Sequence, residues 1–536
     1  MSKKFLWVIL FLITFQPPVL SEMFRMESAT IAEINTAFDT GILTSEKLVQ
    51  LYLNRINAYD TSGPKLNSII TLNPRALERA RELDQERHKN GRRSLLHGIP
   101  VLVKDLFNTH DMPTSGGFLP MAHSQPWRDA FVIKRLRQKG AIILAKVNQN
   151  DWFGEAAWGA STVTGQVQNP YKIGYVPGGS SSGTGASVAA YLGTVGLGTE
   201  TGVSIRNPTS ENNLFGLSPT TGLISRTGVL SHSITHDRAG PMARNVFDLA
   251  ATLSIVAGFD PEDLYTRESI GRIPHEGYTS FMDIDGLKGA RLGVLRDLFS
   301  ENPEEQEGLP LIEASIEAIK NQGALIIDPI TTGLDLFKVI RLVGVKNFEK
   351  RMTSNLYFAH LGPNAAFKDL NELVEKHHDI LSPILIERNK ILSVDHNLEY
   401  IAHLKNRTTI RQLMIYLMDR YELDALIYPF KTLPAWKIGK KWNSNIPKGS
   451  IAKPPPPAYN PLSSSTGLPA LVVPAGFTNE GLPIALEFLG RPFSEPTLIR
   501  LASSYEKATN HRKTPPTTPP LSGEVITNRP LYSKEK

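Results

Sequence analysis

The stretch from Pro177 to Glu200, PGGSSSGTGASVAAYLGTVGLGTE, places three consecutive serines between glycines in the middle of the chain. Glycine- and serine-rich runs are typical of flexible linkers. Here the run leads into small and apolar residues, which suit a close-packed helix and strand better than a linker. A phosphate-binding loop would need a lysine followed by Ser or Thr after the glycines. Thr184, Gly185 and Ala186 stand there instead, so neither interpretation is favoured.

The serine run also matches the nucleophile elbow of α/β-hydrolases, because residues 179–183 read G-S-S-S-G. An elbow follows directly on an apolar strand, and the preceding NPYKIGYVPG is a poor strand. It also needs a later acid and histidine, yet His377, His378 and His396 stand in no special context. The elbow is a weak match, and other parts of the chain must decide.

Short apolar runs alternate with helical segments from about Leu96 onward. HGIPVLVKD (97–105) is typical of a strand that ends in charged residues. AFVIKRLRQKG (130–140) predicts a helix with a glycine C-cap, and AIILAKVN (141–148) predicts the next strand. The same order recurs at 312–328, as IEASIEAIKNQG and ALIID. This alternation predicts an α/β fold with a largely buried sheet.

We expect residues 22–536 to form a single domain. GLPALVVPAGF and GLPIALEFLGRPF, between 467 and 493, predict two more core strands. Residues 333–445 are more helical and charged, and we expect them to form a cap or insertion over the sheet. The tail from about 515 is rich in Pro and Thr, and such composition predicts poor order.

The N-terminus has the features of a secretory signal peptide. MSKK is followed by the apolar run FLWVILFLITF and by small residues near Ser21. We expect residues 1–21 to be cleaved and the protein to be exported, either periplasmic or secreted. A buried N-terminal element or an uncleaved anchor is the alternative. No later run reaches 18 apolar residues, so no stable membrane insertion is expected after cleavage.

Composition excludes several functional classes. The chain has no cysteine, which excludes disulfides, thiol nucleophiles and zinc–thiolate sites. The net charge of +6 comes from 58 basic and 52 acidic residues that are interleaved, whereas nucleic-acid binding favours a concentrated basic stripe. The 13 histidines show no HExxH or comparable ligand spacing. We therefore expect no nucleic-acid partner, no catalytic metal and no cofactor.

Two further blocks accompany the serine run: HGIPVLVKD upstream and GLGTETGVSIRNP (196–208) downstream. Together the three blocks resemble the signature of the amidase signature family, with a texture similar to bacterial peptide amidases. The likeness continues through NNLFGLSPTTGLISRTGVL, HDRAGPMARNVFD and the C-terminal strands, and covers roughly residues 27–515. It implies an α/β/α sandwich in which helices cover both faces of a large, twisted, mixed sheet.

The resemblance implies a Ser–Ser–Lys triad. By position, Lys104 matches the family's general base, Ser180 the relay serine on a cis peptide bond after Gly179, and Ser204 the nucleophile. A serine hydroxyl needs an adjacent base that removes its proton. A lysine can be that base when burial favours its neutral form, and Lys104 follows three apolar residues. From the residues alone, a surface lysine paired with Asp105 is the alternative.

The turn before and at the nucleophile is expected to form the oxyanion hole. Its backbone N–H groups would belong to Thr201, Gly202, Val203 and Ser204. Most relatives have Gly-Gly-Ser here, and the β-branched valine restricts φ. We therefore expect a narrower or reshaped acyl pocket. Supporting roles are expected for Gly179, Ser181, Glu200 and Arg206.

The function implied is an exported amidase that converts a carboxylic amide to an acid and ammonia or an amine through an acyl-Ser204 intermediate. Its partner would be a small-molecule or peptide amide, and the chain would be a monomer or homodimer. Two alternatives are a glutaminase resembling amidotransferase A subunits and a non-catalytic binding relative. The signal peptide argues against the first, and the presence of all three triad residues argues against the second. We expect variable segments, including 148–158 and 340–445, to build the substrate pocket.

Overall fold

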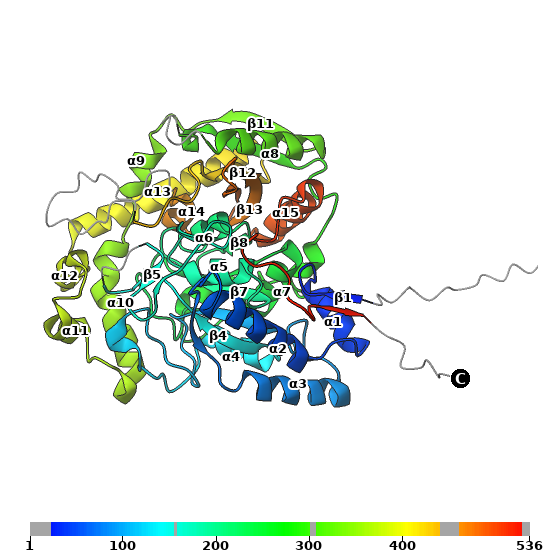
Figure 1. Ribbon diagram of the computed structural model, residues 1–536. Helices are drawn as coiled ribbons and strands as arrows, with labels where there is room; N and C mark the ends of the chain where they lie inside the picture. Colours follow the sequence, from blue (N-terminus) through cyan, green and yellow to red (C-terminus); the bar gives the residue numbers. More distant parts are fainter. Residues whose placement is uncertain (1–22, 155–157, 301–306, 440–459, 528–536) are drawn as a thin grey trace, which may run out of the picture.

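The computed structural model describes residues 23–154, 158–300, 307–439 and 460–527 (Figure 1). The predicted signal peptide, residues 1–21, lies outside these ranges. Within them, no helix is both long enough and apolar enough to cross a membrane.

An 11-stranded sheet runs through the molecule in the order β11-β10-β12-β14-β13-β8-β9-β7-β3-β4-β2. β3 pairs in parallel with β4 and β7, and β10 pairs in parallel with β11 and β12, whereas the other pairs are antiparallel. The predicted large mixed sheet is therefore confirmed. Its strands are β2 (Ile69–Leu72), β3 (Pro100–Lys104), β4 (Ile142–Val147), β7 (Val195–Glu200), β8 (Phe215–Ser218), β9 (Arg238–Ala243), β10 (Arg291–Leu295), β11 (Leu325–Ile330), β12 (Ala425–Lys431), β13 (Ala470–Phe477) and β14 (Pro483–Leu489).

Helices surround this sheet, as Figure 1 shows, and complete the α/β sandwich. The predicted helix–strand pairs are present, because α4 precedes β4 and α8 precedes β11. The helices are α1 (Ile31–Asp39), α2 (Ser45–Arg55), α3 (Ala76–Asn90), α4 (Phe131–Gln138), α5 (Ser182–Ala189), α6 (Arg206–Glu211), α7 (Val246–Val256), α8 (Leu309–Asn321), α9 (Leu336–Arg341), α10 (Lys346–Leu361), α11 (Leu370–His377), α12 (Pro383–Asn389), α13 (Leu398–Arg420), α14 (Leu462–Thr466) and α15 (Glu495–Thr509).

Strands β3 and β7 position the candidate site residues Lys104 and Glu200. Every residue of both strands is buried. Because the two strands are parallel neighbours, their carboxyl ends, Lys104 and Glu200, lie at the same edge of the sheet. The loops that follow these ends therefore meet at one place.

The helical segment expected at 333–445 is shorter than predicted. Helices α9 to α13 lie between residues 336 and 420, but β12 then joins the main sheet between β10 and β14. All seven residues of β12, ALIYPFK, are buried. The boundary was wrong because this short apolar run is a core strand, and helix α13 ends just before it.

The expectation of a poorly ordered tail from residue 515 was wrong for its described part. β15 (Val525–Thr527) pairs antiparallel with β1 (Met23–Arg25). The buried guanidinium of Arg55 lies 2.9 Å from the carboxylate of Glu524. It also donates hydrogen bonds to two carbonyls of the tail. The tail has few apolar side chains with which to pack. It is held instead by its backbone carbonyls, which accept hydrogen bonds from the buried guanidinium of Arg55.

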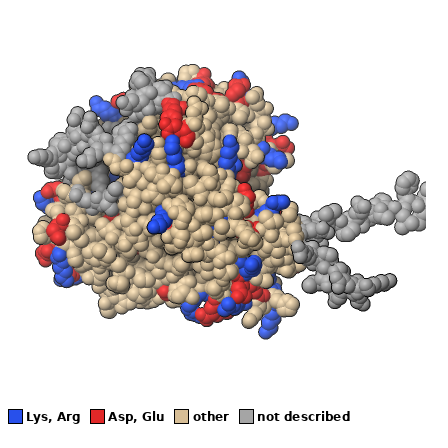
Figure 2. Space-filling model, in the orientation of Figure 1, with Lys and Arg blue, Asp and Glu red and all other residues tan. Residues whose placement is uncertain are grey.

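Basic and acidic residues are interspersed on the face drawn in Figure 2. They gather toward the edges of that face, where blue and red residues adjoin one another, and its middle is mostly neutral. No continuous basic band is visible on this face, in keeping with the interleaved charges of the sequence.

Candidate active site

Lys104, the last residue of β3, has no exposed surface. Its Nζ lies 2.6 Å from Oγ of Ser180 and 3.0 Å from Oγ1 of Thr199. Thr199 stands on the neighbouring strand β7 and was not singled out from the sequence. The structure thus brings Lys104 and Ser180 into hydrogen-bond contact and adds a third hydroxyl.

Burial lowers the pKa of the Lys104 ammonium to about 7, and the nearby carboxylates of Asp237 and Glu200 oppose that shift. Desolvation disfavours the charged form of an amine, whereas negative neighbours stabilise it. Near neutral pH a large fraction of Lys104 is therefore the free amine, which can accept a proton.

The loop that carries Ser180 is held from two directions. The peptide bond between Gly179 and Ser180 is cis, as the resemblance implied. The N–H of Gly179 donates to Oδ1 of Asn207 (2.8 Å), and the N–H of Asn150 donates to the carbonyl of Ser180 (3.0 Å). A Cβ on Gly179 would collide with the side chain of Asn150. A larger residue at this position would therefore have to displace the side chain of Asn150.

Ser181 joins this loop to both neighbouring segments. Its Oγ accepts a hydrogen bond from the N–H of Thr199 (3.3 Å) and donates to the carbonyl of Thr199 (3.2 Å). Its N–H donates to the carbonyl of Ser204 (3.3 Å). These bonds place the backbone of Ser204 beside the Ser180 loop, although 24 residues separate the two serines in the sequence.

Glu200 organises the turn that leads to Ser204. Its Oε2 accepts hydrogen bonds from the N–H groups of Ile205 and Arg206, both at 3.1 Å. Its Oε1 lies 2.9 Å from Nε of Arg206 and 3.0 Å from Nη2 of Arg238. Burial by itself would raise the pKa of Glu200, but these two guanidinium groups hold that pKa below its usual value. Glu200 is therefore a structural anion that fixes the turn.

The carbonyl of Gly202 receives two donors. Nη2 of Arg206 lies 2.8 Å from it, and Oγ of Ser464 lies 2.5 Å from it. Ser464 belongs to a second run of three serines, residues 463–465, which lies in the short helix α14. Only the tertiary structure connects this serine to the turn, because 262 residues separate it from Gly202.

Val203, the departure from the common Gly-Gly-Ser pattern, is buried in an apolar cluster. Its neighbours there include Val176, Phe430 and Trp436. The β-branched side chain thus fills core space beside the turn. The effect of Val203 on the acyl pocket stays a prediction.

Asp237 is a second residue that sequence reasoning missed. It lies just before β9, and its carboxylate accepts hydrogen bonds from the N–H groups of His232 (2.5 Å) and Ser233 (3.2 Å). Burial raises the pKa of Asp237, and its hydrogen bond with Thr201 lowers it. The motif HDRAGP contributed to the family resemblance, and its aspartate was the available signal.

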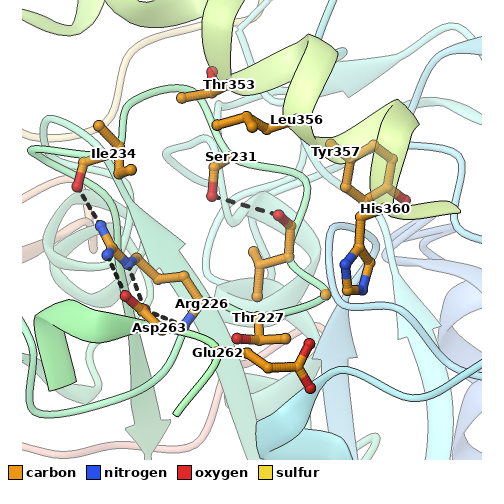
Figure 3. A pocket seen from close by; sticks show the side chains of 12 residues that line it. Arg226, Thr227, Ser231, Ile234, Glu262, Asp263, Thr353, Leu356, Tyr357 and His360 are labelled. Carbon is orange, nitrogen blue, oxygen red and sulfur yellow. Dashed lines mark hydrogen bonds and ion pairs between the residues drawn. The ribbon is translucent and has the colours of Figure 1, made fainter. Parts of the chain in front are cut away.

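A cavity of about 300 Å³ lies beside the loop that leads to Asp237 (Figure 3). Arg226 reaches across to Asp263 (2.6 Å) and to the carbonyl of Ile234, which anchors the loop. Tyr357 and His360 of α10 face the loop from the opposite wall. None of the three triad residues lines this cavity.

One cluster of potential metal ligands occurs among the described residues: His110, Asp111 and Asp129. Arg137 lies 2.7 Å from Asp111 and 3.1 Å from Asp129. The guanidinium of Arg137 is therefore already paired with both carboxylates of the cluster.

Known proteins resemble this chain over most of its length. The model of the family described as Amidase matches residues 47–499. A probable amidase of Arabidopsis thaliana is 33% identical over 519 residues, which are 92% of this chain and 93% of that protein. The A subunit of the glutamyl-tRNA(Gln) amidotransferase of Chloroflexus aggregans is 32% identical, over 92% of this chain and 99% of the relative. The X-ray structure of peptide amidase from Stenotrophomonas maltophilia superposes with a TM-score of 0.79 at 34% identity, covering 91% of this chain and 98% of that one.

Proposed function

Because the chain belongs to the amidase family and is a hydrolase of amide C–N bonds, we propose that it acts through an acyl-enzyme on Ser204, with Ser180 as proton relay and Lys104 as general base. The contact between Lys104 and Ser180 carries this proposal. A buried amine with a pKa about 7 lies 2.6 Å from a hydroxyl, and the nucleophile's backbone is bonded to the same loop.

Acylation begins when neutral Lys104 draws the proton of Ser180, which takes the proton of Ser204. Oγ of Ser204 then forms a bond to the carbonyl carbon of the amide, and the carbonyl π electrons move onto oxygen. The backbone N–H groups from Thr201 to Ser204 would stabilise that oxyanion. The carbonyl re-forms and the C–N bond breaks as Ser180 gives a proton to the departing nitrogen and regains one from the Lys104 ammonium. Ammonia or an amine leaves, and Lys104 is neutral again.

Deacylation follows the same proton transfers, with water as the nucleophile. Lys104, through Ser180, takes a proton from the water that attacks the ester carbonyl, and Ser204 regains its hydrogen as the acid departs. The fixed peptide of Gly202 supports both halves, because Arg206 and Ser464 hold its carbonyl in one orientation. A preorganised turn needs no rearrangement as charge develops.

For the substrate we propose a peptide amide or a small carboxylic amide. The support is the likeness to a peptide amidase over 91% of the chain. A glutaminase activity is the second candidate, favoured by the 32% identity to the A subunit of an amidotransferase. Ammonia release from N-acetylated peptide amides and from glutamine, measured side by side, distinguishes the two.

We also propose that the protein is exported, to the periplasm or beyond, and acts as a monomer or homodimer. The support for export is the N-terminal sequence, with its basic start and apolar run. Fractionation of cells expressing the full chain, with N-terminal sequencing of the mature protein, tests export. Light scattering of the purified protein tests the oligomeric state.

A serine-directed fluorophosphonate probe tests the nucleophile. We expect the wild type to be labelled, Ser204→Ala to be unlabelled and Ser180→Ala to be labelled far more slowly. Ser465→Ala is a matched control in the second serine run, because among the described residues no hydrogen bond joins its hydroxyl to Ser180 or Ser204. Full labelling of Ser204→Ala would overturn the assignment.

A further inference from the structure

Lys346 brings a cationic group to the turn that precedes the nucleophile. It is the first residue of α10, within a segment expected to build the substrate pocket. Its Nζ lies 3.0 Å from the position that a Cβ on Gly202 would occupy. The ammonium therefore lies in the space that a side chain at position 202 would otherwise occupy.

The backbone before Lys346 is tied to the active-site loop. The N–H of Val345 donates to Nε2 of His236 (3.2 Å). One turn into α10, the buried carboxylate of Glu349 accepts hydrogen bonds from Thr235 (Oγ1, 2.5 Å) and Tyr400 (2.8 Å). The position of Lys346 is thus fixed by contacts that do not involve its own side chain.

The surroundings leave Lys346 charged but without a protein acceptor. Burial lowers its pKa to about 8, Arg388 acts in the same direction, and Asp237 and Glu200 oppose the shift. Most of the amine is therefore protonated at neutral pH. Within the described part of the chain, its Nζ makes no hydrogen bond or ion pair. A partly buried ammonium has three donors, and a ligand can supply the acceptors that the protein does not.

We propose that Lys346 binds a carboxylate on the acyl part of the substrate. The inference rests on the proposed function and narrows it to amides whose acyl group carries an acid near the scissile carbonyl. A primary amide has no substituent on its nitrogen, so any group that reaches Lys346 must belong to the acyl part. The position beside Gly202 restricts that acid to a short side chain, as in an aspartyl amide.

N-acetyl-aspartate α-amide and N-acetyl-leucine amide form a matched pair of probes. The two side chains have the same branched shape, and only the first carries a charge. Ammonia release is measured for both with the wild type, Lys346→Met and Lys346→Arg. Lys338→Met, in the neighbouring helix α9, is the control because that lysine is exposed.

We expect the wild type to favour the aspartyl amide. In Lys346→Met its kcat/KM should fall about 10- to 100-fold, the usual effect of losing a hydrogen bond between charged groups. The leucyl amide should change by less than about threefold, and Lys346→Arg should keep the preference. Lys338→Met should behave as the wild type.

Inhibition gives a second readout that needs no variant. Succinate should inhibit hydrolysis of the leucyl amide by the wild type more strongly than butyrate does. Equal losses for both amides in Lys346→Met, or equal inhibition by the two acids, would overturn the proposal. If Ser204 is labelled and the leucyl amide is hydrolysed without any acidic preference, only this inference fails. If no amide is hydrolysed and Ser204 is not labelled, the proposed function fails with it.

Discussion

Nζ of Lys104 lies 2.6 Å from Oγ of Ser180, at the end of a fully buried strand. Burial lowers the pKa of this lysine to about 7, although Asp237 and Glu200 act against the shift. Only the neutral amine can accept the proton of Ser180. The protonation of one buried side chain should therefore control the reaction.

The first prediction concerns the acid limb of the pH profile. We expect kcat/KM to rise about tenfold per pH unit below about 7 and to level off above it. Asp237→Asn removes a negative charge that favours the ammonium, so the limb should move to lower pH. Steady-state kinetics from pH 5 to 9 measures both profiles. If the acid limb stays at the same pH in Asp237→Asn, the limb does not report the protonation of Lys104.

The second prediction concerns stability. Because the pKa of Lys104 is lower in the folded than in the unfolded chain, the unfolded chain binds more protons between about pH 7 and 10.5. The wild type should therefore gain stability as the pH rises through that range. Lys104→Met should be more stable than the wild type at pH 7, and the difference should shrink toward pH 10. Urea unfolding at several pH values measures it, with exposed Lys338→Met as a pH-independent control.

The third prediction concerns Ser464, whose hydroxyl donates to the carbonyl of Gly202. Ser464→Ala leaves that carbonyl with Arg206 alone, and we expect kcat to fall by about tenfold because the turn is less well fixed. The free energy of unfolding should fall by only about 1 kcal/mol. Ser465→Ala, one residue away, should retain full activity. A large loss of stability with unchanged kcat would instead mark Ser464 as a folding residue.

The fourth prediction concerns the tail. Glu524→Ala leaves the buried guanidinium of Arg55 without its carboxylate, and should cost about 3–5 kcal/mol of unfolding free energy. The exposed pair Arg75–Glu78 provides the comparison, because Glu78→Ala should cost less than about 1 kcal/mol. Urea unfolding measures both. Equal effects would show that the tail pairing is no stronger than a surface contact.

The sequence predicted much of the fold, because strands such as β3 and β4 are continuous apolar runs bounded by charge or glycine. It also pointed to Lys104, Ser180 and Ser204, which stand in distinctive blocks. The sequence-based predictions were wrong where the local composition does not reflect the tertiary structure. β12 follows a long polar helix, and the Pro- and Thr-rich tail contains few apolar residues, so neither resembles core structure until its partners are known.

Local chemistry by itself determined strands such as β3 and β4 and helices such as α4, since periodicity and capping act over a few residues. Only the tertiary structure decided which distant groups meet. Ser464 contacts Gly202 across 262 residues, and Lys346 stands over the same glycine from a separate helix. Such contacts depend on how the sheet and its covering helices pack. The pKa of Lys104 likewise depends on its burial in the folded protein, which its own neighbours in the sequence only suggest.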